Sequence, residues 1–188
     1  MKKLMYLSAI LVMVITVNVQ AQTKYFTKEG RAQFYSKAPL EEIEAVNKKV
    51  TSVLDASTGQ VEFSVLMKAF EFQKALMQEH FNENYVESDK FPKATFKGAI
   101  DNASEVKWTS DGVYPVKVTG KMTLHGVAKD ITVPGTIEIK GGKIFAKSTF
   151  NLLIRDYDIE IPNLVKDKVA ETVKVEVNLN YELFTANK

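Results

Sequence analysis

Few residues in this chain could carry out catalysis or bind a metal ion. Its 188 residues include two histidines, His80 and His125, and no cysteine. His80 lies in a segment with helical periodicity, whereas His125 ends an alternating segment just before Gly126. A metal site would need both rings and further carboxylates to meet in space, and the spacing shows no metal-ligand pattern. We therefore predict no metal site and no cofactor.

Covalent catalysis by a serine or a cysteine is not indicated either. The sequence has no Gly-x-Ser-x-Gly motif, which carries the nucleophile in a large class of serine hydrolases. The lack of cysteine removes thiol nucleophiles, thiolate metal ligands and disulfides. We predict that the chain has no catalytic residues, is not an enzyme, and folds around its core alone.

The densest polar cluster runs from Arg155 to Asp158 and reads Arg-Asp-Tyr-Asp. It has two interpretations. Arg155 could lie at the rim of a site and hold an anionic head group, because a guanidinium pairs well with planar anions. Alternatively, the cluster is a charged turn whose aspartates hydrogen-bond the backbone. The residue types favour the turn.

The elements that position these residues are mostly strands, and the last segment of the chain shows it best. Side chains of a strand point alternately to opposite faces of a sheet. Polar residues at even positions separate apolar residues at odd positions, namely Val173, Val175, Val177, Leu179, Tyr181 and Leu183. The segment is therefore predicted to be a long strand with one dry face and one solvated face.

Alternation recurs along most of the chain. It predicts strands over residues 61–67, 94–100, 114–124, 131–139 and 144–152, with shorter ones over 25–36, around Gly30, and over 50–55. Turn residues at 57–59, 110–112 and 141–142 separate several of them. Helical structure is predicted for residues 72–85, where apolar residues recur at a spacing of four, and over 38–47.

These segments predict an all-β fold of about eight antiparallel strands with one helix, a number at which a sheet can close around one ligand. A two-sheet sandwich is the alternative. Closure removes exposed edges, and the long, regular last strand needs a partner on both sides. We therefore favour the barrel.

The N-terminus has the pattern of a secretory signal peptide. Lys2 and Lys3 precede an apolar run over residues 4–19, and Val19-Gln20-Ala21 supplies small residues at a cleavage site. A membrane anchor is the alternative, but the run is shorter than the ~20 apolar residues of a span. We predict cleavage after Ala21, a single domain over residues 22–188, and a periplasmic or secreted protein.

The charge of the mature chain argues against polyanionic partners. Loss of residues 1–21 leaves 23 of the 25 basic residues against 23 acidic residues, so the net charge is zero. Nucleic acids and anionic membrane surfaces select a basic face. We expect no nucleic-acid partner and no stable insertion into a membrane once the signal is removed.

The inward-facing apolar residues have two interpretations that periodicity does not separate. They could form a solid core, in which case the protein is an interaction module whose outer surface binds a partner protein. They could instead line a cavity for an apolar ligand. The candidate lining residues are Phe34, Phe63, Val65, Met67, Phe96, Val116, Val118, Met122, Phe150, Val175 and Leu179.

Three motifs occur together in an order typical of one family. They are Leu-Met-Gln-Glu-His-Phe at residues 76–81, Phe-Pro-Lys-Ala-Thr-Phe-Lys-Gly at 91–98, and Val-Thr-Gly-Lys-Met-Thr-Leu-His-Gly-Val-Ala-Lys at 118–129. In these motifs the chain resembles the YceI-like family of exported bacterial proteins. The likeness covers most of the mature chain.

This resemblance implies a lipocalin-like antiparallel barrel with a helix near one mouth. It also implies an apolar tunnel that holds a polyisoprenoid, a quinone or a similar long apolar lipid, and it favours the cavity over the solid core. His80 and His125 become structural or mouth-lining residues rather than catalytic ones, and the mouth candidates are His80, Phe81, His125 and Arg155. The oligomeric state stays open, with a homodimer as one alternative.

Overall fold

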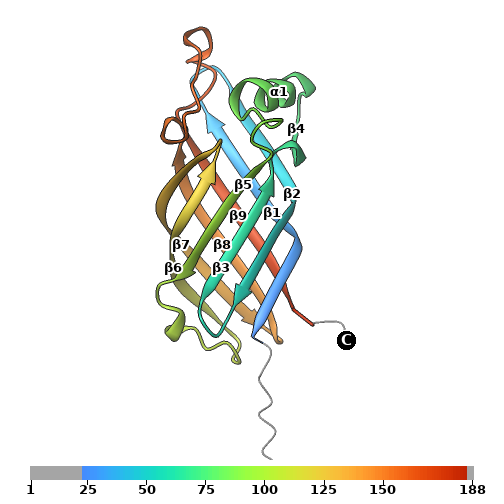
Figure 1. Ribbon diagram of the computed structural model, residues 1–188, viewed down its shortest axis with the longest axis vertical. Coiled ribbons are helices and arrows are strands. Elements are labelled where there is room, and N and C mark those ends of the chain that lie inside the picture. The colour runs from blue at the N-terminus through green and yellow to red at the C-terminus, as the bar shows by residue number, and fades with distance from the viewer. Residues whose placement is uncertain (1–22, 186–188) are drawn as a thin grey trace, which may run out of the picture.

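A computed structural model describes residues 23–185 of the chain (Figure 1). The predicted signal segment, residues 1–21, lies outside the described residues. The strands are β1 (Lys24–Lys37), β2 (Glu42–Asp55), β3 (Gln60–Leu66), β4 (Phe70–Phe72), β5 (Lys93–Ile100), β6 (Gly112–Leu124), β7 (Val127–Lys140), β8 (Lys143–Leu153) and β9 (Thr172–Leu183). The helical elements are η1 (Met67–Ala69), α1 (Ala75–His80), η2 (Phe81–Tyr85), η3 (Ala103–Glu105), η4 (Ile154–Tyr157) and η5 (Asn163–Val165).

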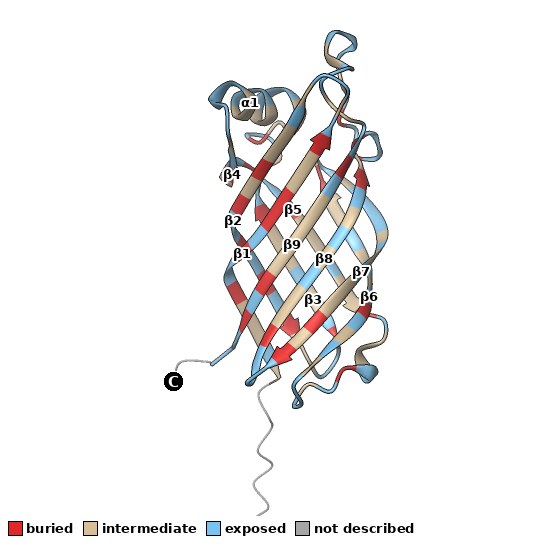
Figure 2. Cartoon of the chain, turned by 180° about the vertical axis from the view of Figure 1, so that it is seen from behind, coloured by how far each residue is buried: buried red, intermediate tan, exposed pale blue. Residues whose placement is uncertain are grey.

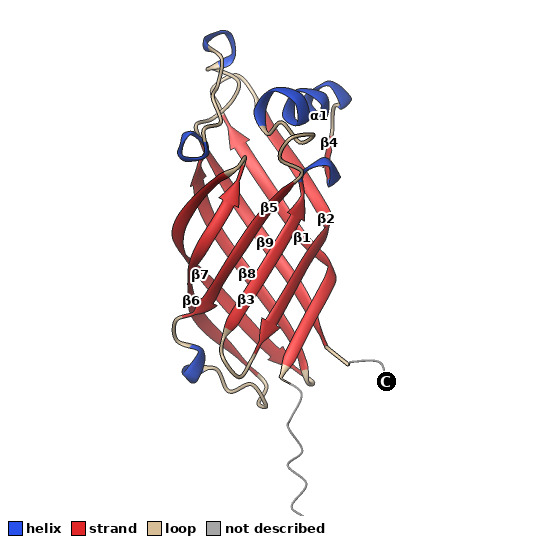
Figure 3. Cartoon of the chain, in the orientation of Figure 1, coloured by secondary structure: helices blue, strands red, loops and turns tan. Residues whose placement is uncertain are grey.

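The strands close into an antiparallel barrel, which confirms the predicted fold class. Their order is β1-β9-β8-β7-β6-β5-β3-β2, and β1 pairs with β2 as well as with β9, so the ring of eight strands has no free edge. The short strand β4 pairs with β2 beyond the point where β3 has ended. The tilted strands and the closed ring are visible in Figure 3.

The alternation of polarity becomes the inside and outside of the barrel wall. In β9, Val173, Leu179 and Tyr181 are buried, whereas the neighbouring Lys174 is exposed. Figure 2 shows the same alternation of burial along the other strands. Leu183, at the end of β9, is an exception to the predicted dry face, because it lies exposed where the strand leaves the barrel.

A β-bulge at Gly30 explains why the first strand has no regular alternation. The register of β1 against β2 shifts on both sides of Gly30. Thr27 is buried before the bulge and Ala32 after it, so the inward positions change from odd to even. One strand with a bulge therefore replaces the one or two short strands predicted here.

The helical structure predicted over residues 38–47 is wrong: residues 38–41 form the bend between β1 and β2, and β2 begins at Glu42. Glu41, Glu42 and Ala45 favour a helix locally, but pairing with β1 outweighs that preference. The inward set of β2 also shifts, from Ala45 and Asn47 to Val50. That shift removes the regular period of two on which the strand prediction depended.

The predicted helix over residues 72–85 is shorter and divided in two. Phe72 belongs to β4, and the helix begins at Ala75. From Phe81 the turns widen into the π-helical segment η2, and the helical structure ends at Tyr85. The spacing of four between Phe72 and Leu76 therefore joins a strand residue to a helix residue and does not mark one helix.

Two tight turns are built from residues with left-handed backbone. The predicted Gly141–Gly142 turn joins β7 to β8, with φ values of 57° and 75°. His125 and Gly126, with φ values of 50° and 76°, join β6 to β7 in the same way. Both turns have positive φ at their two central residues, which matches the twist of the strands they connect.

Candidate functional site

The interior of the barrel holds an apolar cavity of about 550 Å³. All eight strands of the closed ring contribute residues to its lining. This volume lies within the range of ligand pockets, roughly 300–1,000 Å³. The structure therefore decides between the two interpretations of the apolar residues in favour of a cavity rather than a solid core.

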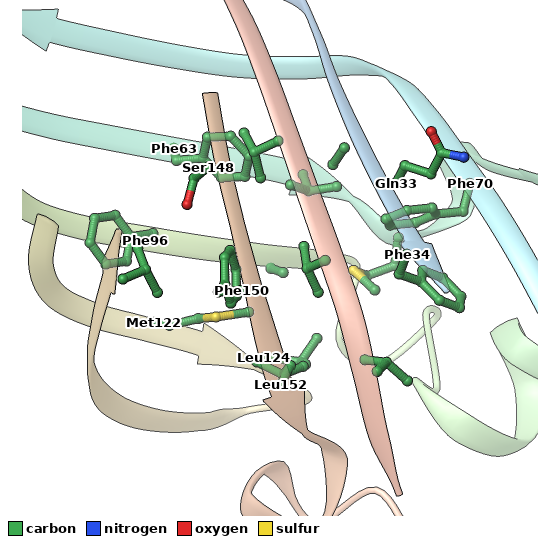
Figure 4. Close-up of a pocket in the computed structure, with 18 of the residues that line it drawn as sticks. Gln33, Phe34, Phe63, Phe70, Phe96, Met122, Leu124, Ser148, Phe150 and Leu152 are labelled. Carbon is green, nitrogen blue, oxygen red and sulfur yellow. The ribbon is translucent and has the colours of Figure 1, made fainter. Parts of the chain in front are cut away.

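All eleven residues predicted to line a cavity do line it: Phe34, Phe63, Val65, Met67, Phe96, Val116, Val118, Met122, Phe150, Val175 and Leu179. Figure 4 shows Phe63, Phe96, Met122 and Phe150 pointing toward one another from different strands. The prediction omitted other lining residues, such as Phe70, Leu124 and Leu152. Alternation could have identified Leu124 and Leu152, whereas Phe70 lies in a three-residue strand that alternation does not detect.

The cavity opens at the end of the barrel that carries α1. Several lining residues at this end come from connecting segments, including Lys74, Val165 and Lys168. Among the described residues, none from the turns at the opposite end lines the cavity. At that opposite end Ile139 and Ile144 are buried. The cavity therefore has one closed end and one mouth.

Four phenylalanines form a cluster at the mouth. Phe34 comes from β1, Phe70 and Phe72 from β4, and Phe81 from the start of η2. The ring centroid of Phe81 lies 5.5 Å from that of Phe34, 5.6 Å from that of Phe70 and 5.0 Å from that of Phe72. Offset and edge contacts at such distances are favourable beyond the burial of area. This phenylalanine cluster therefore holds the helical segment over the mouth.

The structure divides the four predicted mouth residues into two pairs. His80 and Phe81 line the cavity at its mouth. His125 and Arg155 do not line it. The side chain of Arg155 is mostly exposed, with a nitrogen 3.9 Å from a carboxylate oxygen of Glu171. Arg155 thus lies outside the cavity lining.

His125 joins three segments at the mouth end. Its Nε2 lies 2.8 Å from a carboxylate oxygen of Glu87, which follows η2. Its Nδ1 donates to the carbonyl oxygen of Tyr157 in η4 at 3.0 Å, because a carbonyl oxygen only accepts hydrogen bonds. Its ring also meets Phe91 edge-on at 4.7 Å. His125 is therefore a structural residue that fixes the segment following the helices to the barrel.

Replacement of His125 by asparagine is expected to destabilise the protein by about 2 kcal/mol, because two hydrogen bonds and a ring contact are lost. Asparagine tolerates the left-handed backbone of this position, so the turn itself is kept. Urea unfolding measures the change. The control is His80→Asn, whose side chain is exposed at the mouth, for which we expect less than about 0.5 kcal/mol. Equal effects of the two substitutions would contradict the structural role of His125.

A buried polar pair lies in the lining toward the closed end. The hydroxyls of Ser52 and Tyr181 are 2.7 Å apart. Ser52 donates to the carbonyl oxygen of Glu62 at 2.8 Å, so the Tyr181 hydroxyl is the donor of the pair. Burial raises the pKa of Tyr181 to about 12. The tyrosine therefore stays neutral in the folded protein well above pH 10.

This pair predicts a loss of stability in alkali. Between pH 10 and pH 12 the unfolded chain releases the Tyr181 proton while the folded chain keeps it, so the free energy of unfolding falls as the pH rises. A pKa difference of this size corresponds to about 2–3 kcal/mol. Urea unfolding as a function of pH should show this fall, and Tyr181→Phe should remove most of it. An unchanged pH profile in Tyr181→Phe would contradict the assignment.

The described residues do not form a cluster of metal-binding side chains. Over residues 23–185, no group of three or more histidine, aspartate or glutamate side chains is placed to hold one. The helices in this part of the chain are all too short or too polar to cross a membrane.

The fold and the cavity together define a closed antiparallel β-barrel with an apolar interior cavity, the architecture of the lipocalins. The family model of the YceI-like domain matches residues 15–181. The chain belongs to this family, as its three motifs predicted.

Two solved structures show the same fold at low sequence identity. A polyisoprenoid-binding domain from Saccharophagus degradans, implicated in plant cell wall breakdown, superposes with a TM-score of 0.75 at 16% identity and covers 87% of this chain and 99% of its own. BcnA from Burkholderia cenocepacia gives a TM-score of 0.67 at 18% identity, covering 81% of this chain and 96% of its own. No curated protein matches the sequence.

Proposed function

We propose that this protein is an exported, non-catalytic carrier or sequestering protein that holds a long apolar lipid inside its barrel. The single observation that supports this function best is the cavity of about 550 Å³, lined from all eight strands and open at one end. A polyisoprenoid or a prenylated quinone has a long apolar chain, which matches the apolar side chains of this lining. The Saccharophagus degradans domain of the same fold is itself described as polyisoprenoid-binding.

The energetic reason for such a carrier is the low solubility of its ligand. Each CH₂ group of a chain exposed to water costs about 0.8 kcal/mol relative to an apolar environment. The cavity removes this cost along the whole enclosed length of the chain. The closed end excludes water from the tail, and the phenylalanine cluster narrows the mouth.

Export rests on the first 21 residues, whose short basic start, apolar run and small residues before Gln22 have the pattern of a signal peptide. A cell envelope is a compartment in which lipids must cross water between two membranes. N-terminal sequencing of the protein from a bacterial periplasm should begin at Gln22. A chain that keeps residues 1–21 would contradict the proposed export.

Thermal unfolding with added lipid tests the binding itself. A ligand at a hundred times its dissociation constant stabilises the folded state by about 2.7 kcal/mol. For a domain of this size we expect a rise in Tm of about 5–10 °C when a polyprenyl quinone is added to delipidated protein. A short, water-soluble quinone without the prenyl chain is the control and should leave the Tm unchanged. An unchanged Tm with the prenyl quinone would contradict the proposal.

A further inference from the structure

Three leucines stand exposed around the mouth of the cavity. Leu40 is 71% exposed, Leu76 is 61% exposed and Leu164 is 95% exposed. They come from three different segments at the α1 end: the β1–β2 turn, α1 itself and η5 in the β8–β9 connection. Figure 1 shows these segments gathered at one end, opposite the end where β1 begins. We call them the rim leucines.

A hydrogen bond and an ion pair connect the three segments. The backbone N–H of Leu40 donates to the carbonyl oxygen of Asp167 at 2.9 Å, which joins the β1–β2 turn to the β8–β9 connection. Lys74, just before α1, forms an ion pair with Glu41 of the same turn at 3.1 Å. The rim leucines therefore belong to one connected surface rather than to three independent loops.

This surface continues into the cavity. Leu76 lines the cavity although most of its side chain is exposed, and Val165 lines it beside the exposed Leu164. The apolar lining therefore reaches the outside at Leu76 and Val165, although Lys74 and Lys168 also line the mouth. Single exposed leucines are ordinary on protein surfaces, but this arrangement surrounds the only mouth that the described residues form.

The charges next to Leu164 fit the head groups of lipids. Lys166 and Lys168 lie exposed on either side of Asp167, so residues 163–168 have a net charge of +1. Long lysine side chains reach the polar layer of a membrane while apolar neighbours enter the acyl layer. An exposed leucine with exposed lysines two and four residues further on has the residue types that such insertion uses.

We propose that the rim leucines are the surface with which the protein docks on a lipid bilayer when it loads or releases its ligand. This inference rests on the proposed function, because a lipid held in the cavity must come from a membrane. Docking places the mouth against the acyl layer. The ligand then passes between cavity and membrane without exposing its chain to water, and each transfer requires a collision between protein and vesicle.

Transfer kinetics of a fluorescent prenyl alcohol test the proposal. The protein is loaded with this probe and mixed with phosphatidylcholine vesicles, with and without phosphatidylglycerol. For docking, the transfer rate rises in proportion to the vesicle concentration. A rate that is independent of vesicle concentration means release into water, and it would overturn the proposal.

A pair of matched variants assigns the surface. Leu40→Ser/Leu164→Ser changes two rim leucines that do not line the cavity, so the amount of bound probe should stay the same. We expect its transfer rate to fall about tenfold, because less apolar surface enters the membrane. The control, Val53→Ser/Val113→Ser, changes two valines that are 46% and 64% exposed on strands and away from the mouth. It should transfer the probe at the original rate.

The outcomes separate this inference from the proposed function. If the unchanged protein takes up no prenyl probe, the proposed function fails, and flotation of the unloaded protein with vesicles still reports on the rim. If the probe binds but both double variants transfer it equally, membrane docking through the rim is overturned. A change of oligomeric state in the rim variant, with unchanged transfer, would show that these leucines contact a second copy instead, and would also overturn the proposal.

Discussion

The substitution Val118→Arg is expected to abolish retention of a prenyl lipid while the barrel stays folded. Val118 lies in β6, pairs with Ile100 on one side and Val133 on the other, and lines the cavity. An arginine here fills part of the space and places a charge in an apolar lining. Desolvation of that charge against a hydrocarbon chain costs several kcal/mol, so we expect affinity to fall at least about a hundredfold.

The control for Val118→Arg lies on the same strand. Val113 is exposed and does not line the cavity, so Val113→Arg should retain lipid at the original level. Extraction and quantification of bound lipid measure both variants, and circular dichroism confirms that each keeps its β structure. The assignment of the cavity as the binding site fails if Val118→Arg folds and still retains a full complement of lipid. Phe96→Asp, from the neighbouring strand β5, gives a second test of the same kind.

The substitution Phe81→Ala is expected to release the helical segment from the mouth. Phe81 is the member of the phenylalanine cluster that η2 supplies, and its ring contacts Phe34, Phe70 and Phe72. Removal of such a ring costs about 2–4 kcal/mol in a partly buried setting. We expect faster hydrogen exchange over residues 75–85 and dissociation of a bound prenyl lipid at least about ten times faster.

Phe26→Ala is the matched control for Phe81→Ala. Phe26 contacts Phe184 edge-on at 5.8 Å, and it lies in β1 close to where the strand begins, away from the mouth. This substitution also removes an aromatic contact, but it should leave hydrogen exchange over residues 75–85 and the dissociation rate unchanged. Identical rates for the two variants would show that the phenylalanine cluster does not hold the ligand in place.

The wall of the barrel was predictable because one face of each strand is dry. Val116, Val118 and Met122 alternate with lysines and threonines along β6, and the structure places all three on the cavity lining. A solid core and a cavity need the same alternation, so the sequence pattern by itself does not separate them. The family motifs favour the cavity, and the structure shows it.

The mouth was harder to predict because tertiary contacts determine its local structure. Ala45 lies in a sequence of helix-forming residues, yet pairing with Phe34 makes it part of a strand. Phe70 and Phe72 belong to a strand of three residues, which no periodicity reveals. The hydrogen-bond partners of His125 are 38 and 32 residues away in the chain, so no local sequence pattern reveals them. The clustering of the rim leucines leaves no local pattern either.

Native mass spectrometry of the protein purified from a bacterial periplasm tests lipid binding in the barrel most directly. We predict one lipid per chain, and extraction should identify it as a molecule with a polyisoprenoid or prenylated quinone chain. A bare protein mass that stays unchanged after incubation with prenyl lipids would contradict the proposed function.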